Sequence, residues 1–330
     1  MSYWSGRRTL VTGAGGFIGS HLTELLVARG AAVRAFVHYN ARNEWGNLEL
    51  IPEDVRGEVE IVMGDIRDPF GVARAVAGCE QVFHLAALIG IPYSYVAPQT
   101  YVETNITGTL NVLEAVRSNP GTRLVHTSTS ETYGTARYTP IDEGHPLQGQ
   151  SPYSASKIGA DKMVESYACS FELPATTLRP FNTYGPRQSL RAVIPTITAQ
   201  ALAGDVVRLG SLSPVRDFTY VTDTARAFLA VAESEATIGG TFNAGNGKGI
   251  AIGDLAELIL EILDSSARLE TDETRIRPEA SEVFTLLADT AAIAEATGWR
   301  PEVSLRDGLA QTIAFLRDRL ARLKPGLYAV

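Results

Sequence analysis

The glycine-rich segment TGAGGFIG, residues 12–19, constrains the fold of this chain more than any other stretch. It overlaps the end of RRTLVTG, residues 7–13, which predicts a strand. It is followed by the amphipathic SHLTELLVARG, residues 20–30, which predicts a helix that ends at Gly30. Glycines at 13, 16 and 19 permit a tight turn, the close approach of a pyrophosphate and close helix–strand packing. The N-terminus of the helix then faces the anion. The segment predicts a dinucleotide site at which Gly13, Gly16, Phe17 and Ile18 contact the cofactor.

Apolar strands and helices alternate through the first half of the chain. The pattern predicts strands at 7–13, 31–37, 59–65, 81–87, 122–128 and 174–180, with helices that include 105–119 and 154–169. Such alternation predicts a parallel sheet with helices on both faces, whose strands finish at one ligand-binding edge. The second half is less regular, with helices expected at 194–203, 222–232, 252–263 and 305–323.

We therefore expect an α/β fold, a Rossmann-type doubly wound parallel sheet with a smaller C-terminal substrate-binding α/β lobe. The NAD(P)-binding domain is expected to span residues 1–180, with residues 219–245 returning to it. Residues 181–218 and 246–330 are expected to form the substrate-binding lobe.

The composition excludes several classes of function. The 330 residues carry a net charge of −8, which argues against nucleic acid or an anionic membrane surface as the main partner. No apolar run approaches the roughly 20 residues that a membrane helix needs. The two cysteines, Cys79 and Cys169, show neither metal-ligand spacing nor a disulfide framework, so we expect no metal site and a cytoplasmic location.

The end of the second predicted strand bears on the choice of dinucleotide. A carboxylate that binds the adenosine ribose is usual at this point, but Val37 and His38 stand there instead. No acid is present to repel a 2′-phosphate, and Arg42 lies close enough in sequence to neutralise one, so NAD(P) is expected with NADP slightly favoured. Asp65 and Ile66, which end the third strand, are placed to flank the adenine, although Asp65 is equally well explained as a turn residue.

The segment SPYSASK places Tyr153 and Lys157 four residues apart, on one face of a predicted helix. An ammonium group beside a phenol lowers the pKa of the phenol, and a cationic nicotinamide lowers it further. The pair is therefore a candidate general base near neutral pH. The alternative is a solvated helix face, but the chain has only four lysines against 12 tyrosines, so few such pairs arise by chance.

The order of these motifs resembles that of the extended short-chain dehydrogenase/reductases, in particular their NAD(P)-dependent nucleotide-sugar epimerases and dehydratases. The resemblance rests on the glycine loop, on LAA at 85–87, on a strand that ends in Ser/Thr and on Tyr-x-x-x-Lys, and it continues through RPFNTYGPRQ, RDFTYVTD and FNAGNG. It implies that Leu85, Ala86 and Ala87 contact the cofactor, that Asn105 supports the active-site helix and that the protein is a homodimer. The substrate-binding residues that it implies are Asn182, Arg187, Arg216, Arg277 and Glu282.

The segment HTSTSETYG narrows the expected chemistry. Most sugar-nucleotide epimerases of this family lack an acid before Tyr-Gly. Thr129-Ser130-Glu131 instead matches the form found in GDP-mannose dehydratases. The neighbouring stretches are similar to those of legionaminic acid pathway dehydratases. The resemblance implies a nucleotide-sugar 4,6-dehydratase with Glu131 as the base at C5, acting on a nucleotide sugar such as an NDP-N-acetylglucosamine. The alternatives are a 4-epimerase or a uronate decarboxylase of the same family, and a non-catalytic redox sensor. A sensor of this type typically loses the tyrosine or the lysine, and this chain keeps both.

Overall fold

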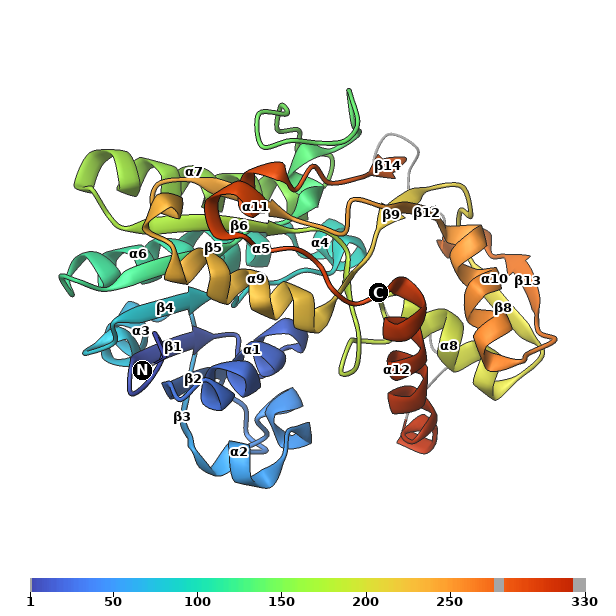
Figure 1. The fold of residues 1–330 in the computed structure, drawn as a ribbon, viewed down its shortest axis with the longest axis horizontal. Helices are drawn as coiled ribbons and strands as arrows, with labels where there is room; N and C mark the ends of the chain where they lie inside the picture. The colour runs from blue at the N-terminus through green and yellow to red at the C-terminus, as the bar shows by residue number, and fades with distance from the viewer. Residues whose placement is uncertain (1, 276–281, 323–330) are drawn as a thin grey trace.

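The computed structural model describes residues 2–275 and 282–322. Its centre is a seven-stranded sheet in which all neighbouring strands run parallel (Figure 1). In sheet order the strands are β11 (Thr241–Ala244), β6 (Ala175–Pro180), β5 (Arg123–Thr127), β4 (Gln81–His84), β1 (Arg8–Thr12), β2 (Ala32–His38) and β3 (Val59–Gly64). The strand order reverses between β1 and β4, which is the switch point of a doubly wound sheet. The predicted fold class is confirmed.

Successive residues of the central strands contribute to different hydrophobic cores, as the pleat of a strand requires. Leu10 packs into one core and Val11 into the other, and Val82 and Phe83 divide in the same way. Helices α1 (Phe17–Ala28), α9 (Val221–Glu233) and α11 (Ala291–Thr297) cover one face, and α3 (Pro69–Val76), α6 (Gly108–Arg117) and α7 (Pro152–Phe171) cover the other. Burial on both faces explains why the strands read as apolar runs.

The connection between β4 and α6 departs from regular α-helix. The predicted helix at 105–119 is divided into the π-helical segment η2 (Val102–Thr107) and α6. Short π-helical segments occur frequently at functional sites, and this one contains Asn105. The remaining short segments are α2 (Glu53–Gly57), α4 (Ile91–Val96), α5 (Pro98–Tyr101) and the 3-10 turns η1 (Gly46–Leu50), η3 (Ser130–Tyr133), η4 (Glu235–Thr237), η5 (Glu273–Arg275) and η7 (Leu320–Arg322).

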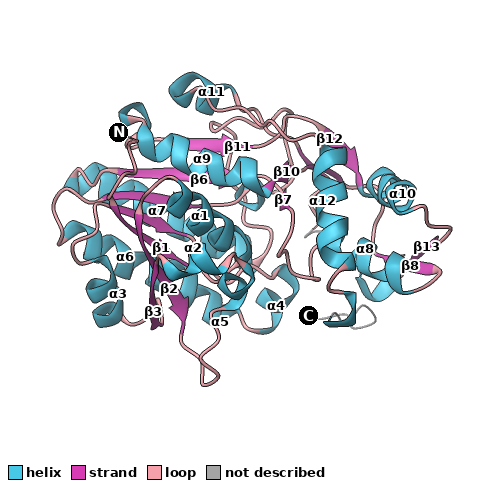
Figure 2. Cartoon of the chain, turned by 60° about the horizontal axis from the view of Figure 1, so that its bottom comes forward, coloured by secondary structure: helices cyan, strands magenta, loops and turns pink. Residues whose placement is uncertain are grey.

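A second group of elements lies where β6 and β11 finish (Figure 2). Its helices α8 (Val193–Ala203), α10 (Ile252–Leu263) and α12 (Leu305–Arg317) share a core to which Ile197, Leu255, Ile259 and Leu309 belong. Its strand pairs are β8 (Val206–Leu209) with β13 (Arg268–Thr271), β9 (Val215–Asp217) with β12 (Gly249–Ala251) and β14 (Thr285–Leu286), and β7 (Thr183–Tyr184) with β10 (Thr219–Tyr220). This smaller lobe therefore faces the carboxyl edge of the sheet, where ligands bind in such folds.

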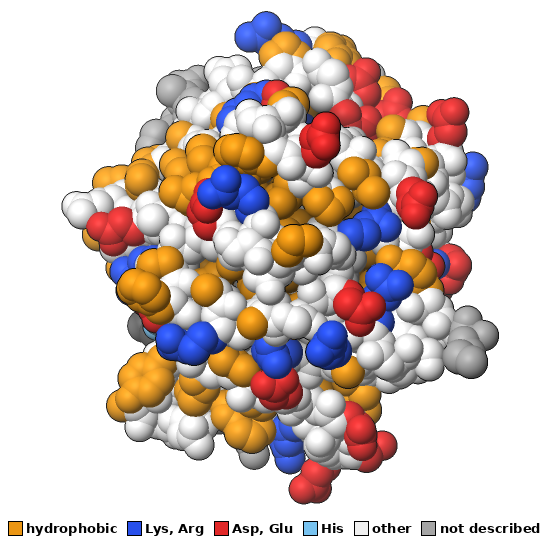
Figure 3. Space-filling model, turned by 90° about the vertical axis from the view of Figure 1, so that its left-hand side faces the viewer, with side chains coloured by type: hydrophobic (Ala, Val, Ile, Leu, Met, Phe, Trp, Pro, Cys, Tyr) orange, Lys and Arg blue, Asp and Glu red, His pale blue; other side chains and the backbone are white. Residues whose placement is uncertain are grey.

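The surface mixes apolar and charged side chains. On the face shown in Figure 3, Lys and Arg side chains are interspersed with Asp and Glu rather than gathered into one basic area. Such a mixture gives a polyanion no continuous basic track on this face. Among the described residues, none of the helices is both long enough and apolar enough to cross a membrane.

Candidate active site

The glycine loop between β1 and α1 is packed so tightly that it leaves no room for a side chain at Gly13 or Gly19. A Cβ on Gly13, whose φ is +70°, would lie 2.8 Å from the backbone nitrogen of Ala86. A Cβ on Gly19 would lie 2.2 Å from the carbonyl oxygen of Gly13. Gly16 is exposed, and a Cβ there would meet only the Gly13 carbonyl oxygen, at 3.1 Å. The loop thus presents bare backbone where a phosphate would approach.

Helix α1 begins at Phe17 and Ile18 with its N-terminal end open to an anion. Gly16 is its N-cap, no side chain caps the first turn, and that turn contains no acidic residue. The first N–H groups of a helix lack partners within it, and the helix dipole adds positive potential at the same end. The glycine loop and the first turn therefore fit the pyrophosphate of a dinucleotide.

The segment that follows β4 runs beside the glycine loop. The Thr12 hydroxyl oxygen accepts hydrogen bonds from the N–H groups of Leu85 and Ala86, each at 3.2 Å. The same oxygen lies 2.8 Å from the ring nitrogen Nδ1 of His84. These bonds hold the start of LAA against the end of β1, and Ala87 continues the segment along this edge of the sheet.

The loop after β2 folds back onto the glycine loop, because the N–H group of Asn47 donates a hydrogen bond of 2.8 Å to the carbonyl oxygen of Gly15. His38 ends β2 and is exposed. The Arg42 side chain is 82% exposed and pairs with Glu44 at 3.7 Å. This loop therefore carries an accessible guanidinium, that of Arg42.

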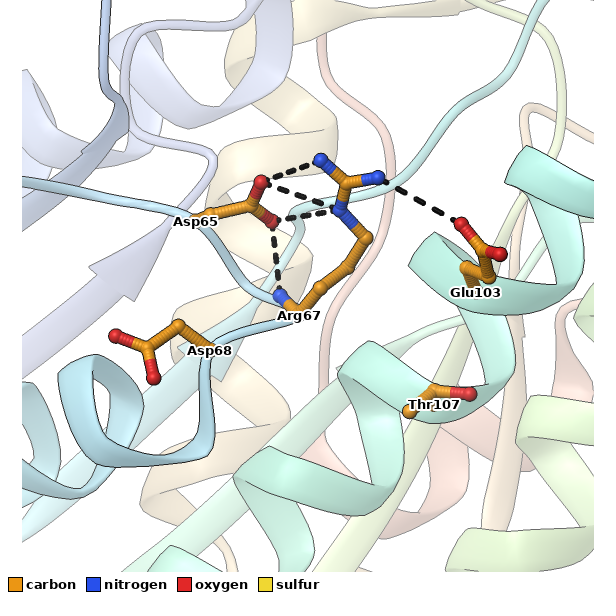
Figure 4. Close-up of a pocket in the computed structure, with 5 residues that line it drawn as sticks. All are labelled: Asp65, Arg67, Asp68, Glu103 and Thr107. Atoms are coloured by element: carbon orange, nitrogen blue, oxygen red, sulfur yellow. Dashed lines mark hydrogen bonds and ion pairs between the residues drawn. The ribbon is translucent and has the colours of Figure 1, made fainter.

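Asp65, which follows β3, is held by Arg67 (Figure 4). The Arg67 guanidinium contacts both carboxylate oxygens, the shorter hydrogen bond measuring 2.6 Å, and these bonds lower the pKa of Asp65. Arg67 also pairs with Glu103 of η2 at 3.6 Å. Ile66 is buried against Gly108 of α6. Asp65 both closes a turn and lines an open pocket of about 420 Å³, whose other described lining residues are Arg67, Asp68, Glu103 and Thr107.

Helix α7 has a well-capped N-terminus, which fixes the backbone of its first turns. The side chains of Ser151 and Ser154 form a reciprocal capping box, and Pro152 occupies the first helical position. Tyr153 and Lys157 follow one turn apart and are both buried. The helix thus holds the tyrosine and the lysine in the relation that the sequence predicts.

The local environment of the pair shifts both pKa values. Burial lowers the pKa of Lys157 from 10.5 to about 8, and Asp161 opposes this shift. Burial also raises the pKa of Tyr153, a hydrogen bond with Thr129 lowers it, and the nearby Glu131 carboxylate raises it. The site therefore needs additional positive charge to ionise the phenol, which a cationic nicotinamide supplies when bound.

Asn105 joins the segment after β4 to α7. Its Nδ2 donates to the hydroxyl oxygen of Ser156 at 2.9 Å and to the carbonyl oxygen of Leu88 at 3.0 Å, and its Oδ1 accepts the N–H group of Leu88 at 2.9 Å. Ser156 precedes Lys157 directly. These contacts agree with the support of the active-site helix that the resemblance implies for Asn105.

The segment after β5 carries the remaining catalytic candidates. Thr129 caps η3, and its hydroxyl oxygen accepts the N–H group of Glu131 at 3.3 Å. Ser130 is buried, and Glu131 is half-buried. The Glu131 side chain lines a cavity of about 450 Å³ between the sheet edge and the smaller lobe.

This cavity gathers residues that are far apart in the sequence. Asn182, Arg216 and Glu282 line it together with Glu131. Arg216 on β9 pairs with Glu282 at 3.4 Å, and both side chains are mostly buried. The side-chain oxygen of Asn182 is buried without a hydrogen-bond partner among the described residues. This oxygen can only accept, so water or a donor group of a ligand would satisfy it.

One predicted substrate residue, Arg187, does not join this group in the structure. The Arg187 guanidinium points elsewhere: it donates to Glu24 at 2.6 Å and lies 2.8 Å from Nδ1 of His21, both on α1. Burial and this guanidinium lower the pKa of His21 to about 4. Arg277 lies outside the described residues.

Two arginines that the sequence reasoning missed line the cavity. Arg275, in η5, is held by Asp272 at 3.0 Å, and Arg191 precedes α8. The sequence signal for Arg275 was its closeness to Arg277, but nothing in the local pattern distinguishes Arg191 from a surface residue. With Arg216, these guanidiniums outnumber the lining carboxylates Glu131 and Glu282 among the described residues.

Comparison with known proteins agrees with this geometry. The family model described as GDP-mannose 4,6 dehydratase matches residues 10–312. The chain belongs to this family of extended short-chain dehydrogenase/reductases. The resemblance that the motifs suggested is therefore confirmed.

Relatives of this extended short-chain dehydrogenase/reductase include dehydratases and epimerases. It is 33% identical to the dTDP-glucose 4,6-dehydratase of Actinoplanes sp. over 316 residues, which cover 94% of this chain and 98% of the relative. The dTDP-glucose 4,6-dehydratase of Streptomyces venezuelae, solved with NAD, is 30% identical with a TM-score of 0.86 and covers 96% of this chain and 99% of its own. The UDP-glucose 4-epimerase of Thermotoga maritima, solved with UDP-glucose, is 30% identical with a TM-score of 0.86 and covers 95% and 99%. The protein is thus an enzyme of the NAD-dependent nucleotide-sugar dehydratase, epimerase and decarboxylase class.

Proposed function

We propose that this protein is a nucleotide-sugar 4,6-dehydratase, which converts an NDP-hexose to its 4-keto-6-deoxy form. The observation that carries the proposal is the carboxylate of Glu131, which lines the substrate-sized cavity and affects the pKa of Tyr153. Elimination of water across C5 and C6 requires a base at C5, whereas inversion at C4 does not. A carboxylate at this point is therefore the group that separates the two reactions.

The cavity suits a nucleotide diphosphate sugar. Arg216 and Arg275 are placed to neutralise phosphates, since a guanidinium forms strong charge-assisted hydrogen bonds with phosphate oxygens. The amide Nδ2 of Asn182 would donate to the same diphosphate, and Glu282 would accept a ribose hydroxyl. The apolar part of the wall, which includes Phe218, accommodates the base. An NDP-N-acetylglucosamine is the hexose derivative that we favour.

The glycine loop, the open end of α1 and the segment Leu85–Ala87 would hold NAD(P), with NADP slightly favoured. When bound, this cofactor would accept a hydride from C4 of the sugar and return one to C6. His38 lies where an acid would select NAD. The Arg42 side chain is exposed and pairs with Glu44 at 3.7 Å, and we propose that it meets the 2′-phosphate of NADP. We propose that Asp65 and Ile66 contact the adenine.

Tyr153 and Lys157 carry out the first proton transfer. Tyr153, as phenolate, accepts the proton of the C4 hydroxyl, and Thr129 donates a hydrogen bond that stabilises the phenolate. Lys157 supplies positive charge nearby while its ammonium group is held by the carbonyl oxygen of Thr127. Burial of both side chains excludes water and strengthens this electrostatic effect.

Glu131 and Ser130 serve the elimination step. The ketone at C4 acidifies the C5–H bond, and Glu131 accepts that proton. The C6 hydroxyl then departs as water and needs a proton, and C5 regains a proton from solvent as C6 is reduced. Because a serine hydroxyl is a poor acid, either Glu131 carries its proton from C5 to the C6 oxygen or Ser130 relays one from water.

We also propose a homodimer. Val102 and Phe171, at the ends of the η2–α6 and α7 helices, each expose about half of an apolar side chain. Helices with apolar residues beyond one stripe usually bury a second surface. Light scattering at micromolar concentration is expected to give the mass of two chains, and a monomer would contradict this proposal.

A substrate screen tests the proposed activity directly. The protein is incubated with NAD or NADP and with dTDP-glucose, GDP-mannose, CDP-glucose, UDP-glucose or UDP-N-acetylglucosamine. We expect one of these to lose a single water, seen by mass spectrometry, and to give a 4-ketone that absorbs in strong alkali. A product of unchanged mass with inverted C4 would show a 4-epimerase instead. A UDP-uronate incubated in the same way would lose carbon dioxide if the protein were a decarboxylase.

A further inference from the structure

The segment from Ser128 to Tyr133, which carries the proton-transfer candidates, is contacted at both ends by one buried ion pair. The pair joins Asp161 of α7 to Arg179 of β6, with Nη2 of the arginine 2.9 Å from Oδ2 of the aspartate. Their side chains are only 4% and 6% exposed, respectively. Neither residue lines the cavity, and the proposed reaction gives neither of them a chemical role.

Asp161 holds the first end of the segment. Its Oδ2 accepts the hydroxyl of Ser128 at 2.6 Å, and its Oδ1 lies 3.1 Å from Nε2 of His126 on β5. The backbone N–H group of Ser128 also donates to the carbonyl oxygen of Leu178 at 2.7 Å. The residue immediately before Thr129 is therefore fixed through its side chain and its backbone.

Arg179 holds the second end. Its Nη1 donates to the hydroxyl oxygen of Tyr133 at 3.0 Å, and the guanidinium carbon lies 4.9 Å from the centre of the tyrosine ring. The Tyr133 hydroxyl in turn donates to Oδ1 of Asn243 on β11 at 2.7 Å. Tyr133 is fully buried, so its position depends on these partners.

A buried ion pair is a poor source of stability, because the cost of removing two charges from water offsets much of their attraction. A buried ion pair can instead serve to hold the groups around it in one specific arrangement. Here the groups are the two ends of a six-residue segment, Ser128 to Tyr133, and Lys157 stands one helical turn before Asp161 on α7.

We propose that Asp161 and Arg179 are positioning residues, which set the placement of Glu131 against the substrate through Ser128 and Tyr133. The proposal rests on the proposed function, since it gives Glu131 the C5 proton. A displacement of about 1 Å in a reacting group can cost on the order of a hundredfold in rate. The ion pair therefore acts on catalysis without contact with the reacting atoms.

Mild substitutions test this without opening the buried pair. Ser128→Ala removes the bond to Asp161, and Tyr133→Phe removes the bond to Arg179. The control is Asp223→Asn, which alters another buried carboxylate: Asp223 pairs with Arg226 at 2.5 Å, accepts backbone N–H groups of residues 302 and 303, and does not line the cavity. Thermal unfolding of all three variants measures the purely structural effect.

Two measurements are made on each variant. One is kinetic: the rates of C5–H exchange with D₂O and of water loss. The substrate is whichever of the five nucleotide sugars named above turns over fastest. The other is amide hydrogen exchange of the peptide covering residues 127–134, followed by mass spectrometry without substrate. We expect Ser128→Ala and Tyr133→Phe to slow C5 exchange about 10- to 100-fold with little change in KM. The amides of 127–134 should exchange faster in these variants, and Asp223→Asn should change neither quantity beyond its effect on Tm.

The outcomes separate the positioning role from the proposed function. Where the wild type exchanges C5–H, unchanged exchange in both variants overturns the positioning role, whether or not the amides loosen. Equal slowing in Asp223→Asn also overturns it, because the effect would then follow stability alone. A wild-type protein that inverts C4 without C5 exchange contradicts the dehydratase proposal instead. The positioning role is then overturned if amide exchange in 127–134 matches the wild type in both variants.

Discussion

The ammonium group of Lys157 donates a hydrogen bond of 2.7 Å to the carbonyl oxygen of Thr127, the last residue of β5. This contact ties the active-site helix to the strand that leads into Thr129 and Glu131. The lysine is held in a buried position where its charge is costly, and its pKa is lowered to about 8 as a result.

Replacement of Lys157 by methionine is expected to stabilise the fold while it abolishes activity. The pKa of Lys157 is lower in the folded protein, about 8, than its ordinary value of 10.5, so the folded state is penalised wherever the lysine is charged, which is below about pH 8. The penalty is relieved as the pH rises from about 8 to 10.5. Lys157→Met should therefore raise the unfolding free energy at pH 7 by on the order of 1–3 kcal/mol, with a gain that shrinks in alkali.

Denaturant unfolding of both proteins between neutral pH and pH 10 checks this expectation. If Lys157→Met is less stable than the wild type at pH 7, the hydrogen bond to Thr127 outweighs the cost of the buried charge. In either case we expect Lys157→Met to lose C4 oxidation, because Tyr153 loses the positive charge that favours its phenolate.

A methyl group at Gly16 is expected to weaken cofactor binding without much effect on the fold. Gly16 has φ of −79°, which suits alanine, and a Cβ there would meet only the Gly13 carbonyl oxygen, at 3.1 Å, so that oxygen would have to shift by a few tenths of an ångström. The methyl group would occupy the exposed side of the loop that we assign to the pyrophosphate. Calorimetry should show at least about a tenfold loss of NAD(P) affinity, which is about 1.4 kcal/mol.

Gly57→Ala is the matched control, because a Cβ on Gly57 meets nothing within 4 Å. It should leave both Tm and cofactor affinity unchanged. Equal affinities for Gly16→Ala and the wild type would show that the pyrophosphate does not approach this part of the loop.

The end of β2 predicts the cofactor preference. Cofactor-free protein is expected to bind NADP at least as well as NAD, since His38 replaces the usual acid and Arg42 is accessible. Arg42→Ala should then weaken NADP but not NAD, because only NADP carries the 2′-phosphate. If calorimetry on the wild type shows NAD binding more than tenfold tighter, about 1.4 kcal/mol, this interpretation of the β2 end is wrong.

The sequence predicted those features whose determinants are local. The glycine loop is read from spacing alone, because the turn, the helix start and the packing of Gly19 all involve neighbouring residues. Tyr153 and Lys157 are likewise fixed by helical periodicity. Their arrangement in the structure follows from the capping box at Ser151, which lies only two residues upstream.

Features set by long-range packing could not be read in this way. Arg187 was expected near the substrate phosphates, but its partners Glu24 and His21 lie more than 160 positions earlier in the chain. Arg275 reaches the cavity because η5 follows β13, which pairs with β8, and the end of β8 at Leu209 also lines the cavity. Asp161 and Arg179 meet only because α7 crosses back over β6. No local pattern in the sequence predicts such long-range contacts.

Glu131→Gln provides the sharpest separation of dehydration from C4 oxidation. Glutamine keeps the shape of the side chain and its ability to form hydrogen bonds, but it cannot accept the C5 proton. Tyr153 and Lys157 remain in place, so the first oxidation should proceed and the reduced cofactor should accumulate, as measured by its near-ultraviolet absorbance. Loss of a positioned general base should slow water elimination on the order of 10²–10⁴-fold.

Tyr153→Phe is the companion variant, and it should block even the first oxidation, because the phenol that accepts the C4 hydroxyl proton is absent. Exchange of C5–H with D₂O should vanish in Glu131→Gln, since exchange requires both the C4 ketone and a base at C5. A Glu131→Gln protein that eliminates water at a near-normal rate would show that Glu131 only faces the cavity. The carboxylate would then have lost its role as the base at C5, and another group of the site would have to accept that proton.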